Sequence, residues 1–209
     1  MSDSKRRKII TTARQMFTTM PYDKVTTAEI AKQAGVAYGL IAHHFEHKRG
    51  LYLAVIGEMA DEIAELHDTA TPSDAPPTEQ LRDVLRHHVA YIDAHADTFL
   101  ALMRGGVGAD LEHQTTIETL RSVGIRRIQG ALGITDPVPP VLRTALRGWV
   151  GYLDEIMIDR IVHGDVAAES LVDLAYAALI VTLRRVRYLD GTIQYGDDVV
   201  AALNSEEAR

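Results

Sequence analysis

Apolar residues recur at three- and four-residue steps over most of this chain, which is the spacing that gathers them on one side of an α-helix. No stretch alternates convincingly between apolar and polar residues as a half-buried strand does. We therefore predict an all-α fold of about nine helices. The long helices are expected over residues 5–19, 48–69, 78–94, 111–132, 140–162 and 170–187, with two consecutive short ones near 26–34 and 38–45 and a third short one over 98–103.

The short helices expected near 26–34 and 38–45 have the features of a pair joined by a sharp turn. Thr26 and Glu29 are spaced as a capping box, in which each side chain bonds the backbone N–H of the other residue. Gly35 is able to adopt the left-handed conformation that a sharp interhelical turn needs. Ile41 and Phe45 are four residues apart and would pack inward together. This layout is that of a helix-turn-helix, in which the second helix lies in the major groove of DNA.

The apolar, glycine and basic positions of residues 6–52 resemble the DNA-binding domain of the TetR family of bacterial transcriptional regulators. The set is specific as a whole, and the rest of the chain resembles the family in length and helical texture. The matching residues are Ile9, Ile10, Ala13, Phe17, Val25, Thr26, Thr27, Ile30, Ala31, Ala34, Gly35, Val36, Gly39, His44, Phe45, Lys48 and Leu51.

This resemblance implies roles for individual residues in a DNA complex. The positions that meet base edges are Tyr38, Gly39 and Leu40. The positions at the phosphate backbone and the groove edge are Thr27, His43, His44 and Lys48.

The sequence departs from the family pattern at two positions. Ala37 stands where the family usually has a serine that caps the recognition helix, and Ala42 stands where a tyrosine usually bonds phosphate. Both replacements weaken the expected anchoring to the DNA backbone, and basic residues near the N-terminus would compensate.

Charge is distributed unevenly along the chain. The net charge is −7, but residues 1–52 carry nine Lys and Arg against four Asp and Glu, a net charge of +5. The remaining residues carry a net charge of −12. A basic end attracts phosphate while an acidic body repels it. We therefore expect Lys5 and Arg6 to belong to a DNA-binding arm, and we divide the chain into a DNA-binding domain over 1–47 and a helical ligand-binding and dimerisation domain over 48–209.

Several other classes of protein are disfavoured. The chain has no cysteine, which excludes disulfides and thiolate metal sites. No apolar segment follows the basic run at residues 5–8, and the longest apolar run, residues 171–183, is shorter than the roughly 20 residues of a membrane span. His43 and His47 are four apart, but the short helix is expected to end between them, so we predict no metal site and no cofactor. We expect a cytoplasmic protein.

The last long helix is apolar on nearly all sides. Such a helix is buried on more than one side. It lies either at the centre of its domain or between its own core and a second subunit, and alanines among the leucines favour the second arrangement. We predict a homodimer through residues about 140–162 and 170–187, with Leu179 at the interface.

Large and flexible apolar side chains on the inward faces of the C-terminal helices predict a pocket for a mostly apolar small-molecule effector. Its candidate lining residues are Met59, His88, Tyr91, Phe99, Met103, Ile117, Leu120, Trp149, Tyr152 and Met157. The alternative is that these residues simply form the core, and that His88 is a hydrogen-bonded core histidine.

The function predicted from these features is that of a ligand-responsive, dimeric transcriptional regulator. It is expected to be a repressor that binds an inverted-repeat operator in double-stranded DNA and is not an enzyme. Two alternatives remain at this point. One is an all-α enzyme that uses His88 or His95 with a carboxylate, and the other is a helical interaction module that does not bind DNA.

Overall fold

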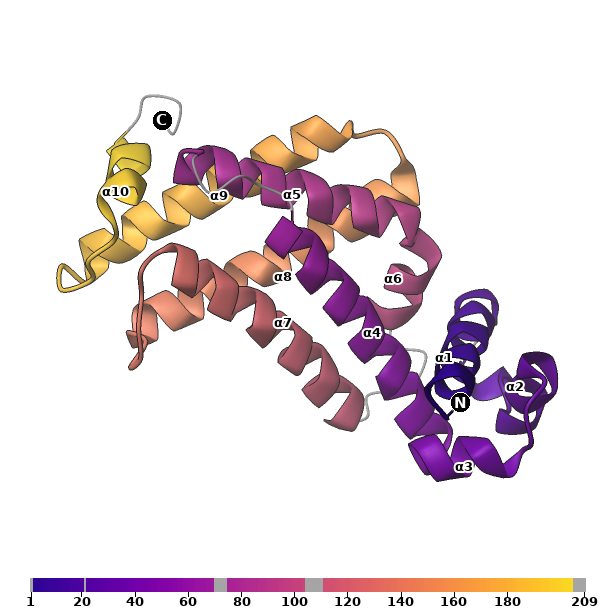
Figure 1. Ribbon diagram of the computed structural model, residues 1–209. Coiled ribbons are helices and arrows are strands. Elements are labelled where there is room, and N and C mark those ends of the chain that lie inside the picture. Colours follow the sequence, from indigo (N-terminus) through magenta and orange to yellow (C-terminus); the bar gives the residue numbers. More distant parts are fainter. Residues whose placement is uncertain (1, 21, 70–74, 104–110, 205–209) are drawn as a thin grey trace. The chain divides into compact units, whose positions relative to one another are not determined.

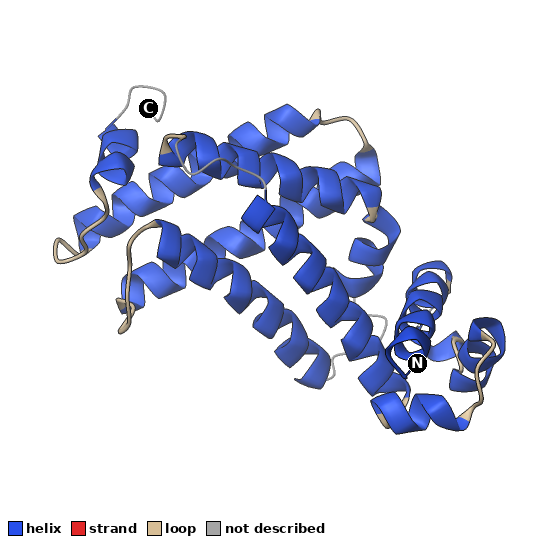
Figure 2. Ribbon diagram, viewed as in Figure 1, coloured by secondary structure: helices blue, strands red, loops and turns tan. Residues whose placement is uncertain are grey.

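The chain folds into α-helices joined by short connections. The computed structural model describes residues 2–20, 22–69, 75–103 and 111–204, and within these ranges it contains ten α-helices, one 3₁₀ turn and no strand (Figures 1 and 2). The all-α prediction is therefore confirmed. Residues 70–74, between two of the predicted helices, and residues 104–110, between two others, fall outside the described residues.

The elements closely follow the predicted ones. Their bounds are α1 (Ser2–Thr19), η1 (Tyr22–Lys24), α2 (Thr27–Ala34), α3 (Gly39–Phe45), α4 (Lys48–Thr69), α5 (Pro77–Ala94), α6 (Ala96–Met103), α7 (Leu111–Ala131), α8 (Pro140–His163), α9 (Ala168–Leu189) and α10 (Asp197–Asn204).

The helix α10 was not predicted, because the chain after Tyr188 reads as a polar tail. Ile193, Tyr195 and Leu203 of this segment are nevertheless buried, and α10 packs on α5 and α9. The guanidinium of Arg184 also donates from Nε to the carbonyl oxygen of Leu203 at 2.9 Å, which satisfies a carbonyl at the end of α10. A few well-placed apolar residues are thus enough to fold a tail that looks hydrophilic on average.

The helices form two compact units. Unit 1 comprises residues 1–64 and 95–120, and unit 2 comprises residues 65–94 and 121–209. The core of unit 1 is built by α1, α2, α3 and the first half of α4, and Ile117 of α7 packs against it. The predicted DNA-binding domain, residues 1–47, lies entirely within unit 1, and its boundary at residue 47 stays a prediction.

Unit 2 is organised around the packing of α9 on both α8 and α5. Since a short connection joins α8 to α9, the two helices run in opposite directions side by side. The indole Nε1 of Trp149 donates to the carbonyl oxygen of Ala175 at 2.9 Å in the interior, and this bond fixes which parts of α8 and α9 lie level with each other. Leu179 is 1% exposed, so it belongs to the core of its own unit, and the prediction that places it at the dimer interface is wrong.

Candidate nucleic-acid interface

The connection between α2 and α3 has the geometry that the sequence predicts. The backbone N–H of Glu29 donates to Thr26 Oγ1 at 3.2 Å, and the N–H of Thr26 donates to the Glu29 carboxylate at 3.2 Å. Gly35 ends α2 with φ 62° and ψ 41°, in the left-handed region that favours glycine. The Val36 N–H then donates to Ala31 O at 3.0 Å. These bonds fix the angle at which the chain enters α3.

Helix α3 buries one side and exposes the other. Ile41 and Phe45 are buried in the core of unit 1, as predicted. The side chain of Tyr38 is 63% exposed at the start of the helix, and Gly39 and His43 are exposed after it. Leu40 and His44 are half-buried. The outward side of α3 is therefore free to approach a ligand of matching shape.

The start of α3 carries no side-chain cap, which fits the replacement at Ala37. The residue before the helix, Tyr38, is already in the right-handed helical region and makes no capping bond through its side chain. The first turn is closed instead by the Leu40 N–H, which donates to Ala37 O at 2.9 Å. Ala42, the other departure, is exposed on the outward side.

The histidines near the end of α3 have separate environments. His44 Nε2 is buried and has no hydrogen-bond partner, so this nitrogen does not face solvent. The rings of His43 and His44 meet edge to face with centroids 5.1 Å apart. Within the described part of the chain, no three His, Asp or Glu side chains gather as a metal site would require.

A tight turn connects α3 to α4. Glu46 has φ 64° and ψ −55°, and the His47 N–H donates to Phe45 O at 2.7 Å. This is a classic γ-turn, a rare conformation that is strained for a residue with a side chain. A Cβ atom on Gly50 would lie 2.1 Å from Phe45 O, so only glycine fits at this position of α4.

His47 has a structural role that the sequence analysis did not predict. Its Nδ1 accepts the backbone N–H of Gly50 at 3.0 Å and so caps the first turn of α4. The acceptor role requires that this Nδ1 carry no proton. The only sequence signal for it was a histidine directly before an expected helix start.

Lys48, which the resemblance places at a DNA phosphate, is tied to the protein itself. Its Nζ donates to Tyr22 O and to Val25 O, each at 3.0 Å, and lies 4.1 Å from the centroid of the Tyr22 ring. An ammonium group has three N–H donors, so one donor is left for a phosphate. Lys48 therefore holds α4 to the segment that precedes α2, whatever else it contacts.

An aromatic cluster lies beside this lysine. The Tyr52 ring meets Phe17 and Tyr22 edge to face, with centroids 5.1 Å apart in each pair. Burial, together with the nearby Tyr22, raises the pKa of Tyr52 to about 12. The cluster packs Phe17 of α1 against Tyr52 of α4, with the half-buried Tyr22 at its edge.

The basic residues near the N-terminus lie in the first turns of α1 and do not form a separate arm. Lys5 and Arg6 are both exposed. The Arg6 guanidinium carbon lies 5.5 Å from the centroid of the Phe45 ring, and Nη1 lies 3.8 Å from Glu58. Lys8 Nζ is the atom nearest to the position that a Cβ of Gly35 would occupy, at 3.5 Å. Lys8 therefore lies beside the turn between α2 and α3, and Arg6 lies beside the end of α3. Thr27 is half-buried at the start of α2.

Polar contacts within unit 1 join α1 to α4 and α6. Arg14 Nη1 donates to both carboxylate oxygens of Glu62, at 2.7 and 3.0 Å. The hydroxyls of Thr18 and Thr98 lie 2.7 Å apart. These contacts, together with the packing of α6 on α1, tie the three helices into one unit.

The ten residues predicted to line an effector pocket are divided between the two units. Those in unit 1 are Met59, Phe99, Met103, Ile117 and Leu120, of which the Leu120 side chain lies outside the described residues. Those in unit 2 are His88, Tyr91, Trp149, Tyr152 and Met157. Met157 and Trp149 are buried in the core of unit 2, whereas Tyr152 is 37% exposed. The pocket itself stays a prediction.

Two family models match the chain. Residues 9–55 match the model of bacterial regulatory proteins of the tetR family, and residues 77–182 match a tetracyclin repressor-like C-terminal domain. The first match contains the whole of α2, the turn and α3, and the second begins with α5 and ends within α9.

Relatives with assigned functions match over a shorter range. The transcriptional repressor Rv1474c of Mycobacterium tuberculosis is 34% identical over 61 residues, which are 29% of this chain and 33% of that protein. The repressor AcnR of Corynebacterium diphtheriae is 31% identical over 83 residues, or 40% of this chain and 41% of that protein. The matches thus span well under half the length of these curated relatives.

Solved structures share the fold over nearly the whole chain. A tetR-family regulator from Streptomyces coelicolor has a TM-score of 0.77 at 23% identity, covering 96% of this chain and 89% of that one. The regulator FadR from Bacillus subtilis, in complex with stearoyl-CoA, has a TM-score of 0.63 at 20% identity, covering 84% and 96%.

Proposed function

This chain belongs to the TetR family of bacterial regulatory proteins, and we propose that it is a dimeric DNA-binding transcriptional repressor whose affinity for DNA is controlled by a small molecule. One observation supports the proposal most strongly. The capping box, the left-handed Gly35 and the inward packing of Ile41 and Phe45 together hold α3 with its other side facing solvent. That is the geometry with which a recognition helix enters the major groove.

The exposed side of α3 supplies the groups that would read bases. Tyr38 offers a hydroxyl and a ring at the start of the helix, where such motifs contact base edges. Gly39 carries no side chain, so the backbone is able to approach the groove closely. Leu40 is half-buried and His43 is exposed one turn later. We assign Tyr38, Gly39, Leu40 and His43 to base and groove-edge contacts.

Phosphate contacts fall to residues around α3. Lys5 and Arg6 supply exposed positive charge on α1. Thr27 stands at the start of α2, where free backbone N–H groups favour an anion. Lys48 keeps one donor for a phosphate, and His44 offers only its second ring nitrogen, since Nε2 is buried.

The DNA-binding proposal is tested by selecting binding sites from random-sequence DNA with the full-length protein. We expect an inverted repeat with half-site centres about 34–36 Å apart, or a multiple of that spacing. The affinity for the selected DNA should fall steeply with salt, because phosphate contacts release counterions. If no sequence is enriched, and affinity for DNA is undetectable at low salt, the proposal is wrong.

A dimer is proposed because an apolar stripe of α9 is left uncovered in unit 2. Leu174, Val181 and Tyr188 are 50%, 55% and 76% exposed, and they recur every seven residues along α9. Helices that pair with helices show this spacing, and a two-fold pair presents two recognition helices to a symmetric operator. Sedimentation of the protein at micromolar concentration tests this, with a monomer as the contradicting result.

The effector is proposed to be mostly apolar, such as an acyl or aromatic compound. The candidate residues within unit 1 whose side chains are described, Met59, Phe99, Met103 and Ile117, are all apolar. A protein of the same fold was crystallised with stearoyl-CoA. Phe99 and Met103 belong to α6, whose Thr98 contacts Thr18 of α1. A ligand that displaces α6 would thereby move α1 and lower the population of the DNA-binding state.

A thermal-shift screen with acyl-CoAs of increasing chain length and with aromatic acids tests the effector proposal. A ligand that raises the melting temperature should also release the selected DNA. The replacement Thr18→Val should leave ligand binding intact while weakening the release. A compound that stabilises the protein but leaves DNA affinity unchanged would argue against control by that compound.

The enzyme alternative has no comparable support. His88 and His95 lie on α5 and directly after it, and every relative described above carries the name of a regulator or repressor. Among the described residues, none of the helices combines the length and the apolar character that crossing a membrane requires.

A further inference from the structure

The solvent-exposed side of α8 and α9 carries both apolar residues and charged residues, and the two signs of charge are separated along it. On α9 the residues that point away from the core of unit 2 are Leu174, Ala177, Val181, Arg185 and Tyr188, all of them exposed. On α8 the corresponding exposed residues are Gly148, Tyr152, Glu155, Asp159 and Val162. We call these ten residues the outer face. Its charged residues are Arg185 on α9 and Glu155 and Asp159 on α8, and Leu174 and Val181 supply apolar surface between the ends of α9.

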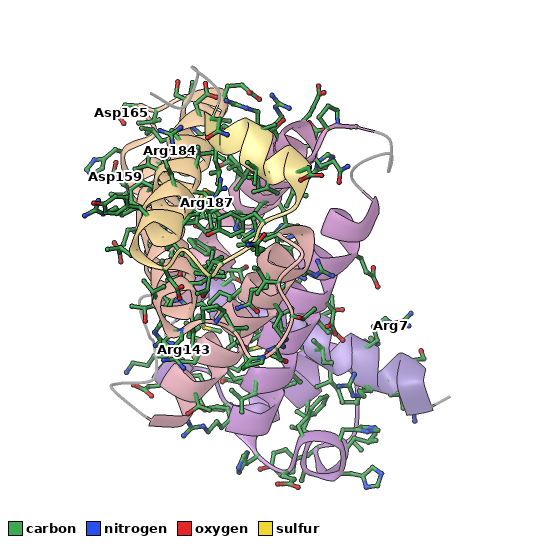
Figure 3. All side chains as sticks on the ribbon, turned by 90° about the vertical axis from the view of Figure 1, so that its left-hand side faces the viewer. Arg7, Arg143, Asp159, Asp165, Arg184 and Arg187 are labelled. Atoms are coloured by element: carbon green, nitrogen blue, oxygen red, sulfur yellow. The ribbon has the colours of Figure 1, made fainter. Side chains whose placement is uncertain are left out.

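The acidic and basic charges stand at opposite ends of the outer face. The Trp149–Ala175 hydrogen bond sets these two residues level with each other. Because the helices run in opposite directions, Glu155 and Asp159 then lie level with the beginning of α9 and with the turn before it. Arg185 stands near the other end of α9. Figure 3 shows Asp159 and Asp165 on the side of unit 2 that α8 and α9 form.

Arg185 is held in place but not neutralised. Its guanidinium carbon lies 4.7 Å from the centroid of the Tyr188 ring, a cation–π contact that orients the side chain at low cost. Arg185 and Glu155 make no ion pair with any residue in the described part of the chain. Asp159 contacts only His163 in this way, at 3.6 Å between exposed groups. The outer face thus presents unpaired charge of both signs.

We propose that these charges set the register of the dimer: two copies pair with their α9 helices antiparallel, and Arg185 binds Glu155 and Asp159 of the partner subunit. This inference rests on the proposed dimer and specifies its geometry. A two-fold axis near Ala177 and Ala178 places small side chains where the helices cross. It also brings Leu174 against Val181 of the partner subunit.

The same axis brings the basic end of each outer face to the acidic end of the other. Arg185 then reaches the level of Glu155 of the partner subunit, and the interaction occurs twice because the interface is isologous. A parallel arrangement would instead bring Arg185 against Arg185 of the partner subunit and the acids against acids. Complementary charges at an interface fix its orientation and exclude such alternatives.

Charge reversal followed by rescue tests the proposal. The dimer dissociation constants of the full-length variants Arg185→Glu and Glu155→Arg/Asp159→Arg are measured by sedimentation at 50 mM and 500 mM salt, and circular dichroism checks that each variant is folded. We expect each reversal to raise the constant at least ten-fold at 50 mM salt, and less at 500 mM. Combining the reversals should bring it back to within about three-fold of wild type. Arg126→Glu, which reverses an exposed arginine on α7, is the matched control and should change nothing.

The possible failures are distinguishable. If Arg185→Glu leaves the constant unchanged, or if the combined variant is no better than its parents, the charge register is wrong even though the dimer stands. If Val181→Glu also leaves the dimer intact, the outer face is not the interface. A wild-type monomer that still selects a DNA sequence would overturn the dimer and its register while leaving DNA recognition in place.

Discussion

The α2–α3 region and the α8–α9 pair show two different relations between sequence and structure. In the first, cap and turn residues such as Thr26, Glu29 and Gly35 determine the angle between α2 and α3 through bonds to their near neighbours in sequence. The exposed side of α3 can therefore be predicted from the sequence. In the second, a helix that is apolar on nearly every side fits both a core and an interface. Only the packing in three dimensions separates Leu179, which is buried, from Val181, which is exposed. Local chemistry specifies the candidate site for DNA, while burial specifies the candidate site for a second subunit.

The largest effect is expected from introducing a charge on either side of α9. Leu179→Glu places a carboxylate in the core of unit 2 without a partner, so we expect a loss on the order of 4–5 kcal/mol or more and an unfolded or aggregated protein. Val181→Glu places the same group on the outer face and should leave a folded, soluble monomer. Circular dichroism and sedimentation of both variants measure this, and equal behaviour of the two would remove the distinction between core and outer face.

The next largest effect on stability is expected from replacing glycine by alanine at two positions of α4. Gly50→Ala puts a methyl group against the backbone carbonyl of Phe45, whereas Gly57→Ala meets nothing within 4 Å. Overpacking of this kind costs typically 1–3 kcal/mol, while alanine in place of glycine within a helix gains about 1 kcal/mol. We therefore expect opposite shifts in the denaturant midpoint, and a loss of DNA affinity for Gly50→Ala alone. A stabilised Gly50→Ala variant would show that the γ-turn at Glu46 adapts freely.

Lys48 combines a structural role with the proposed contact to a DNA phosphate. Lys48→Met keeps the aliphatic chain but removes two bonds to carbonyls and the contact with Tyr22, so unit 1 should lose about 1–3 kcal/mol. Lys5→Ala removes an exposed charge with no such role. It should lower the salt dependence of DNA binding by about one contact per subunit without changing stability. Denaturant titrations and binding at several salt concentrations separate the two effects, and an unchanged stability of Lys48→Met would contradict the structural role.

Removing the Tyr52 hydroxyl is expected to have the smallest effect on stability at neutral pH, because its ionisation changes stability only at alkaline pH. Its pKa is raised from 10 to about 12 in the folded state, so the folded state holds this proton more tightly than the unfolded state does. The resulting stability is complete below pH 10 and is lost as the pH rises through 12. The denaturant midpoint of the wild type should therefore fall between pH 10 and 12 more steeply than that of Tyr52→Phe. Parallel pH profiles for the two proteins would show that Tyr52 titrates normally.

The sequence predicted the elements well and the roles of single residues less evenly. Helices from α1 to α9 followed from apolar periodicity, but α10 did not, because its buried residues are sparse in a polar segment. The capping box and Gly35 were predicted because their chemistry is local. The dependence of Gly50 on the Phe45 carbonyl, the capping by His47 and the inward turn of Lys48 were missed, because each depends on a contact made by the γ-turn or by an element far along the chain.

The effector residues illustrate the same limit. Trp149 and Tyr152 share an apolar stripe in the sequence, yet the first is bonded to α9 in the core and the second is partly exposed. Periodicity assigns residues to one side of a helix, but it does not say what that side contacts.

The central claim is that the exposed side of α3 reads DNA, and it is tested most directly by the base preference of Tyr38→Ala. The affinities of the wild type and of this variant are measured for the selected operator and for every single-base change in one half-site. We predict that the variant loses discrimination at one or two adjacent positions, by about 1–3 kcal/mol per base pair, and keeps the wild-type preference elsewhere. A uniform loss at every sequence, or no loss at all, would contradict the assignment of α3 as the recognition helix.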